Sequence, residues 1–345
     1  MIRETFRIGE YSAGNRMDLR DGAFLSDSNA YLGAGFSGFS GNVVCVSEPG
    51  TVWTNTGEVD LTGGGNALTV SNGATGYSLE LTANGGGTPG GIVIDGTNTR
   101  WLCASRAGAG LYWSDSSLTI TNGARLASGN GSIGLGTVES NRVVVTGSGS
   151  VWSNSGSLRA GYDGNANSLI VDRGGQVFCS DGSVGADTGG DWNFARVSDT
   201  GSLWRCSGSL LVGDSHFNRL LVENGAALAC TSAVVGWGTS NEVVVTGAGS
   251  SWSNSGGLVI GAGSFGEWNR FTVSSGACAW SRSAILGERI GTANCAVVTG
   301  GGSVWTSAAW ITVGLTGLYN RLLVEDGGAV YCRTGFVGAA AGSTG

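Results

Sequence analysis

The chain has 345 residues, of which 65 are glycine, 2 are proline and 12% are charged, and its net charge is −7. Scarce proline excludes a collagen-like triple helix, and a negative chain with no basic run is an unsuitable partner for duplex nucleic acid. No apolar run is long enough for a membrane-spanning helix, so we expect no membrane insertion. Met1 to Gly9 lack the apolar core of a signal peptide, so we expect another export route or a longer parent chain.

One sequence unit recurs along nearly the whole chain, and it usually opens on asparagine. The openers form two interleaved series with a double repeat of about 51 residues: Asn15, Asn66, Ser116, Asn167, Asn218, Asn269 and Asn320, and Asn42, Gly90, Asn141, Asn193, Asn241 and Asn294. The thirteen units are 23 to 28 residues long. A period of about 25 residues in β-rich sequence is typical of a solenoid.

Each unit begins with a predicted strand. The second and fourth residues after the opener are apolar at all 26 positions, as at Val143 and Val145, and the fifth is polar, as at Thr146. Alternate residues of a strand share one face, so this pattern predicts one buried face. A glycine-rich turn, a second short strand and a third short strand follow, and the third usually ends in glycine, as in residues 158–161.

Three strands and three turns in about 25 residues predict one coil of an all-β, right-handed parallel β-helix (β-solenoid). We expect a single domain over residues 1–345, with a partial coil at 1–14 and thirteen coils at 15–345, either complete or part of a longer array. Coils about 4.8 Å apart would build a rod of roughly 60 Å. The opening asparagines should stack as a ladder whose amides bond to turn backbone and to the next asparagine.

The run from Asn141 to Gly161, continued from Asn167 to Val177, resembles repeats of large bacterial surface proteins. These repeats are similar to autotransporter passenger domains and related autotransporter-like repeat proteins. The resemblance covers about residues 15–338 and implies a β-helix outside the cell, at the bacterial surface, in adhesion or as a spacer. It implies no catalytic residue, because the matched motif is structural.

Six tryptophans recur in alternate coils: Trp53, Trp101, Trp152, Trp204, Trp252 and Trp305. The other coils carry a smaller residue there, usually leucine or valine, as at Leu126 and Val177. Large side chains alternating with smaller ones fill a core without voids, so we expect these tryptophans to be buried. The alternative is an outward aromatic row that binds a polysaccharide.

The remaining chemistry-bearing residues predict no catalytic, cofactor-binding or metal site. Cys179, Cys206 and Cys230 share one position in successive coils, where they either fill a tight inner site or form one disulfide. His216 is expected to be a solvated turn residue. A calcium site at three turn carboxylates has no supporting sequence motif: Asp163, Asp187 and Asp214.

The sequence therefore predicts a structural or interaction protein, not an enzyme: a surface stalk, adhesin or fibre subunit. The expected partner is the protein itself, by end-to-end stacking or through an apolar stripe on the outer face of the first strands, or the continuation of a longer chain. That stripe holds Val93, Val144, Ile170, Leu221, Val244, Val297 and Leu323. A carbohydrate-binding module with an aromatic row, contacting surface polysaccharide, is the alternative, and a polysaccharide-degrading β-helix enzyme is weaker still.

Overall fold

The computed structural model describes residues 4–33, 39–84, 91–111, 113–187 and 189–339, and its described residues are all-β. The chain folds as a β-solenoid of about 13 turns, in which strands about 25 residues apart in sequence pair in parallel. It divides into two compact units: unit 1 covers residues 1–158 and 167–179, and unit 2 covers 159–166 and 180–345. The expected opener at Gly90 and residues 340–345 of the last expected coil lie outside the described residues.

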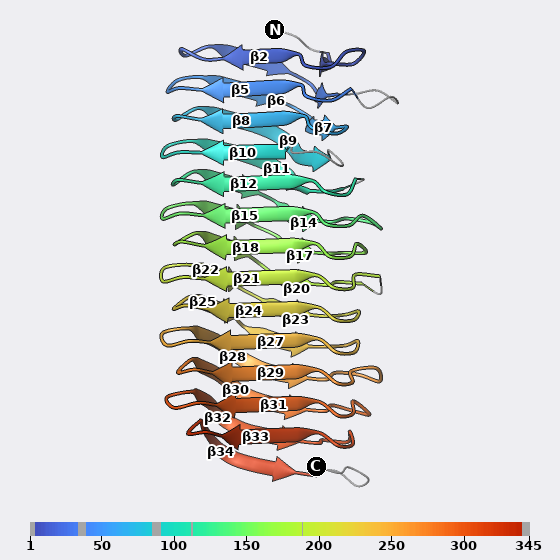
Figure 1. Ribbon diagram of the computed structural model, residues 1–345, viewed down its shortest axis with the longest axis vertical. Coiled ribbons are helices and arrows are strands. Elements are labelled where there is room, and N and C mark those ends of the chain that lie inside the picture. Colours follow the sequence, from blue (N-terminus) through green and yellow to red (C-terminus); the bar gives the residue numbers. More distant parts are fainter. Residues whose placement is uncertain (1–3, 34–38, 85–90, 112, 188, 340–345) are drawn as a thin grey trace. The chain divides into compact units, whose positions relative to one another are not determined.

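In unit 1 the first strands of successive coils form one parallel sheet (Figure 1): β2 (Arg16–Leu19), β5 (Val43–Ser47), β8 (Ala67–Ser71), β10 (Gly91–Asp95), β12 (Ser117–Thr121), β15 (Arg142–Thr146) and β18 (Ser168–Asp172). The second strands are β3 (Phe24–Asp27), β6 (Val52–Asn55), β13 (Arg125–Ser128), β16 (Val151–Asn154) and β19 (Gln176–Cys179). The third strands are β1 (Phe6–Ile8), β4 (Ala30–Leu32), β7 (Glu58–Thr62) and β14 (Asn130–Ile133), and β17 (Leu158–Ala160) falls at the boundary. In β9 (Thr75–Asn84) and β11 (Arg100–Ala109) the second and third strands are continuous.

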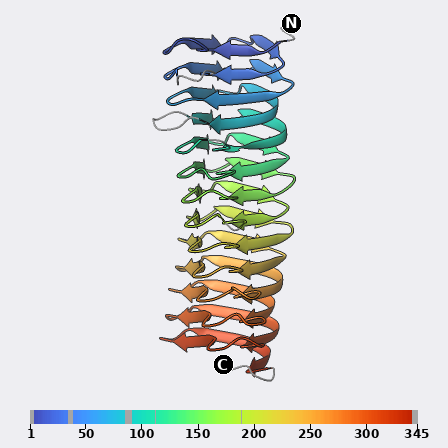
Figure 2. The ribbon, with the colours of Figure 1, turned by 90° about the vertical axis from the view of Figure 1, so that its right-hand side faces the viewer.

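Unit 2 repeats this plan, and Figure 2 shows the stacking within each unit from the side. Its first strands are β21 (Phe194–Ser198), β24 (Arg219–Glu223), β27 (Glu242–Thr246), β29 (Arg270–Ser274), β31 (Cys295–Thr299) and β33 (Arg321–Glu325). Second strands are β22 (Leu203–Cys206) and β25 (Ala227–Cys230), and third strands are β20 (Gly182–Val184), β23 (Ser209–Val212) and β26 (Ser232–Val235). Continuous second and third strands are β28 (Ser251–Ile260), β30 (Cys278–Leu286), β32 (Val304–Val313) and β34 (Ala329–Val337).

The continuous strands refine the expected three short strands per coil. Where β28 pairs with β30, the register shifts between Asn254 and Gly257. The turn between the second and third strands is there reduced to an irregularity, because a bulge bends a strand without ending its pairing.

The first strands bury the face that the sequence predicted. Val143 pairs with Leu169 and Val145 with Val171, and all four side chains have no exposed surface. Equivalent positions from β5 to β31 are at most 1% exposed. Parallel pairing in this register gives each unit one continuous apolar interior.

The opening asparagines form the expected ladder. In unit 2 the backbone N–H of Asn218 donates to Oδ1 of Asn241 at 2.9 Å, and the backbone N–H of Asn241 donates to Oδ1 of Asn269 at 2.9 Å. The side-chain amides repeat the pattern at 3.2 Å and 3.1 Å. Unit 1 has the same ladder at Asn15, Asn42 and Asn66 and at Asn141 and Asn167. At each rung, an asparagine Oδ1 accepts a hydrogen bond from a buried backbone N–H in the turn, a donor that the pairing of the strands does not satisfy.

The ladder explains the glycine that ends most third strands. Gly213 has φ +83°, and a Cβ there would lie 1.9 Å from Cγ of Asn241 in the next coil. Gly110, Gly134, Gly236 and Gly261 meet their asparagines in the same way. Only glycine allows both the left-handed backbone and this close approach.

A second ladder, which the sequence reading missed, runs through the turn before the tryptophan strands. The hydroxyl of Ser150 accepts from the backbone N–H of Gly123 at 2.9 Å and donates to the carbonyl of Thr146 at 2.7 Å. Thr99, Ser250 and Ser303 accept from glycine N–H groups in the same way. The Ser or Thr two residues before Trp101, Trp152, Trp252 and Trp305 is therefore a structural residue.

Candidate functional site

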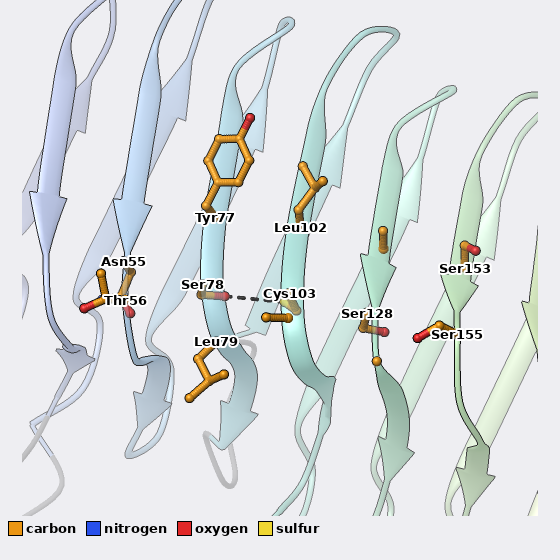
Figure 3. Close-up of a pocket in the computed structure, with 13 residues that line it drawn as sticks. Asn55, Thr56, Tyr77, Ser78, Leu79, Leu102, Cys103, Ser128, Ser153 and Ser155 are labelled. Atoms are coloured by element: carbon orange, nitrogen blue, oxygen red, sulfur yellow. Dashed lines mark hydrogen bonds between the residues drawn. The ribbon is translucent and has the colours of Figure 1, made fainter.

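Unit 1 carries a groove of about 650 Å³ on the outer side of its second strands, where they approach the third (Figure 3). Tyr77, Leu79 and Leu102 supply its apolar wall and are 36%, 46% and 38% exposed. They lie on the continuous strands β9 and β11. The other lining residues are small or hydroxylated: Asn55, Thr56, Ser78, Cys103, Ala104, Ala127, Ser128, Gly129, Ser153 and Ser155.

The groove offers hydroxyl groups and an apolar wall, with no carboxylate among its lining residues. Ser78 Oγ lies 3.4 Å from Cys103 Sγ and accepts the indole N–H of Trp101 at 2.9 Å. Burial raises the pKa of the Cys103 thiol to about 12, so the thiol is protonated and a weak nucleophile near neutral pH. This lining is suited to contact with a neutral molecule and lacks a paired acid and base.

All six tryptophans of the alternating row are at most 2% exposed, which confirms the predicted core. Trp152 pairs with Leu126 on one side and Val177 on the other, so large and smaller side chains alternate along the interior. The aromatic row that the sequence offered as a sugar platform at these positions is wrong, because their rings do not reach the surface.

Each indole N–H needs an acceptor in this interior, and the preceding coil supplies it. Trp152 Nε1 donates to Ser128 Oγ at 3.2 Å, and Trp252 Nε1 donates to Cys230 Sγ at 3.4 Å. Trp53, Trp101 and Trp305 donate to Asp27, Ser78 and Ser281. The cysteine trio shares this inner position, where the Cys230 sulfur is the acceptor.

Asp60 is a buried carboxylate on the third strand β7 of unit 1. It is 7% exposed, and its Oδ1 accepts from Thr82 Oγ1 at 3.0 Å and from Asn84 Nδ2 at 2.9 Å. Burial is the main cause that raises its pKa to about 6, and the nearby carboxylates of Glu58 and Glu80 add to it. The folded chain therefore binds a proton at Asp60 more tightly than the unfolded chain does.

This carboxylate should make stability depend on pH. A raised folded pKa contributes stability that is complete below about pH 4 and lost as the pH rises through about 6. Asp60→Asn keeps both hydrogen bonds and removes the charge. We expect it to raise the free energy of unfolding by roughly 2–3 kcal/mol at pH 7.5 and to change it little at pH 4.

Urea unfolding at the two pH values measures this difference. Asp95→Asn is the matched control, because Asp95 accepts from Asn122 at an exposed site. An equal effect of Asp60→Asn at both pH values would contradict the assignment.

The turn residues that the sequence singled out do not converge on a site. His216 is half-buried rather than simply solvated, because its Nδ1 accepts the backbone N–H of Thr239 in the next coil at 3.0 Å. In the described ranges, no group of three or more His, Cys, Asp or Glu side chains is placed to hold a metal ion, and this includes Asp163, Asp187 and Asp214.

The turns of unit 2 that precede the opening asparagines carry exposed aromatic side chains. Trp192, Phe217, Trp268 and Tyr319 are 61%, 43%, 66% and 74% exposed, and each stands directly before a ladder asparagine. Trp237 and Phe265 lie in the same turns and are 43% and 76% exposed. The sequence reading missed these residues because the turns have no periodicity in side-chain direction.

The outer stripe of the first strands is only partly exposed. Ile170 and Val297 are 4% and 2% exposed, whereas Val93, Val144 and Val244 are half-buried. A lateral contact through this face therefore stays a hypothesis. Within the described residues, the model contains no helix with the length and hydropathy needed to cross a membrane.

Comparisons with known proteins give little beyond this geometry. No family model matches the chain, and no curated protein matches it. Among solved structures, the chain is similar to a fragment described as TibC-catalyzed hyper-glycosylated TibA, with a TM-score of 0.41 and 14% identity over 100% of both chains.

Proposed function

We propose that the chain is a structural and interaction β-helix: a surface stalk, adhesin or fibre subunit outside the cell, and not an enzyme. The observation that carries this proposal is the way in which coils join. Each coil forms hydrogen bonds to the next coil and packs its apolar interior side chains against those of the next coil. In unit 2 the ladder from Asn193 to Asn320 continues from rung to rung. Each coil thus offers hydrogen-bonding groups and apolar side chains with which another coil can pair, as expected of a rod that lengthens by adding coils.

In the last described coil of unit 2, which contains β33 and β34, interior apolar positions are exposed to solvent. Val324 pairs with Val298, and Val337 pairs with Val313, so both occupy interior positions. They are 44% and 73% exposed, whereas Val298 and Val313 are 0% and 5% exposed. Exposed strand edges with apolar interior positions favour pairing with another strand. We propose that a coil of a second copy of the chain covers them.

Sedimentation velocity and electron microscopy over a range of protein concentrations test this stacking. Wild-type protein should form end-to-end assemblies. The double variant Val324→Lys/Val337→Lys places two charges at interior positions and should weaken assembly by more than about tenfold. Tyr331→Lys is the matched control, because Tyr331 lies on β34 with Val337, is 60% exposed and pairs with the half-buried Thr306.

The outcomes separate clearly. Assembly that survives in Tyr331→Lys but not in the double variant supports the proposal. A wild-type protein that remains monomeric at every concentration, or a double variant that assembles as well as wild type, would count against stacking between copies.

A further inference from the structure

One position in the turns of unit 2 is occupied by side chains of very different size. It is the residue directly before each ladder asparagine, and in unit 2 it is occupied by Ala166, Trp192, Phe217, Ser240, Trp268, Ala293 and Tyr319. Each of these residues has a left-handed backbone, with φ between 53° and 59°. The four aromatic residues are defined here as the turn row.

The coil-to-coil hydrogen bonds hold this backbone whatever the side chain. The N–H of Trp192 donates to the carbonyl of His216 at 3.1 Å, and the N–H of Trp268 donates to the carbonyl of Thr292 at 3.1 Å. Ser240 and Ala293 make the equivalent bonds at 2.9 Å. Serine and alanine therefore suffice for the fold at this position.

Aromatic residues are an unfavourable choice on structural grounds alone. A bulky side chain with positive φ is strained by about 1 kcal/mol or more, and glycine avoids that strain. Unit 1 has Gly14, Gly41 and Gly65, and then Asp115 and Ser140, at the equivalent positions. Strain combined with an exposed aromatic ring at one residue indicates a role in binding, since strained residues gather at ligand sites. Unit 1 exposes Tyr11 and Trp113 in its equivalent turns, but neither stands directly before an opener.

The turn row is spaced along the stack rather than gathered into one patch. The rings of Trp192 and Phe217 are stacked, with centroids 4.3 Å apart and an interplanar angle of 10°. Trp268 is two coils beyond Phe217, and Tyr319 is two coils beyond Trp268, so each step is about 10 Å. That spacing is close to the length of a disaccharide. Small residues lie between the rings, unlike the contiguous apolar centre of a protein–protein interface.

The charges around the turn row favour an uncharged ligand. The same turns carry the carboxylates Asp163, Asp187, Asp191, Asp214, Glu267 and Glu288, beside Arg289 and His216. Carboxylates repel a polyanion and accept hydrogen bonds from hydroxyl groups. Trp237 adds a half-exposed ring in the same turns, placed against Gly263 so that a Cβ there would lie 2.9 Å from the ring.

We propose that the turn row of unit 2 binds a neutral polysaccharide that lies along the stacked coils, with its pyranose rings against Phe217, Trp268 and Tyr319. The Trp192–Phe217 pair would hold one end of the bound chain, and the neighbouring carboxylates would accept its hydroxyl groups. This inference rests on the interaction role proposed above and names the ligand class and the surface.

The test uses affinity electrophoresis and isothermal titration with hydroxyethyl cellulose and xyloglucan as neutral probes and alginate as the anionic probe. The four-site variant Trp192→Ser/Phe217→Ser/Trp268→Ser/Tyr319→Ser uses the residue that Ser240 already places at this position. Phe24→Ser is the control, since Phe24 is an aromatic residue of unit 1 that is 67% exposed. All proteins carry Val324→Lys/Val337→Lys, so that assembly does not enter the measurement.

We expect binding of at least one neutral probe, no binding of alginate, and a loss of more than about tenfold, or roughly 1.4 kcal/mol, in the four-site variant. Thermal unfolding of that variant should match the Lys background within a few degrees. Three outcomes overturn the proposal: no neutral probe binds, the four-site variant binds as well as the background, or the variant is strongly destabilised, which would make the row a structural stack. None of these results decides whether coils stack end to end, because that is read by sedimentation of the wild-type protein.

Discussion

Replacing Trp252 with alanine should lower the free energy of unfolding by about 3–5 kcal/mol. Trp252 is 2% exposed and lies between Leu228 and Ala279 of the neighbouring coils. Its ring packs edge-on against Phe271, with centroids 5.3 Å apart. Alanine leaves a cavity that the paired strands cannot close, because their register fixes the coil spacing.

Urea unfolding followed by circular dichroism measures this loss. Trp268→Ala is the matched control in the same unit, since Trp268 is 66% exposed and should change stability by less than about 1 kcal/mol. Equal losses at the two tryptophans would show that the interior is not closely packed around Trp252.

Replacing Asn241 with alanine should have a comparable effect, about 3–5 kcal/mol, without creating a large cavity. Its Oδ1 accepts from the backbone and side chain of Asn218, and its Nδ2 donates to Ser215 and Asn269. Asn241 and Asn218 have no exposed surface, so the donors and acceptors that lose their hydrogen-bond partner cannot bond to water instead. Each unsatisfied buried polar group destabilises by about 1–3 kcal/mol.

Hydrogen exchange of the Asn218 amide is the sharpest readout, since that N–H loses its acceptor directly. It should exchange faster in Asn241→Ala than the other amides of the same sheet. Asn15→Ala is the control, because Asn15 is half-buried at the first rung and should lose less stability. A similar loss at both sites would mean that the ladder's burial does not matter.

Much of this architecture could be predicted from the apolar side chains that recur at every second residue of the first strands. Val143 and Val145 are buried and Thr146 is half-buried because a strand sends alternate side chains to opposite faces. The alternation of Trp152 with Leu126 and Val177 indicated a core in the same way. Asparagine recurring at the head of each unit indicated a ladder, since only a stacked turn uses the same amide so often.

Other features depend on contacts between coils that a pattern does not encode. The sequence predicts that Cys230 either fills a tight inner site or forms a disulfide, and it does not signal that the Cys230 sulfur accepts the indole N–H of Trp252 from the next coil. Asp60 gave no sequence signal, because its burial arises from the strand that covers it in unit 1. Its raised pKa follows from that burial.

The sequence by itself determined the coil, its buried face, its asparagine ladder and the place of six tryptophans, because strand periodicity and the 25-residue repeat constrain those side chains. Only the tertiary structure decided which other aromatic residues reach solvent. Trp192 and Trp268 are exposed because a left-handed backbone, held by bonds to the next coil, directs their side chains outward. Turn side chains have no period, so their direction is set by stacking alone.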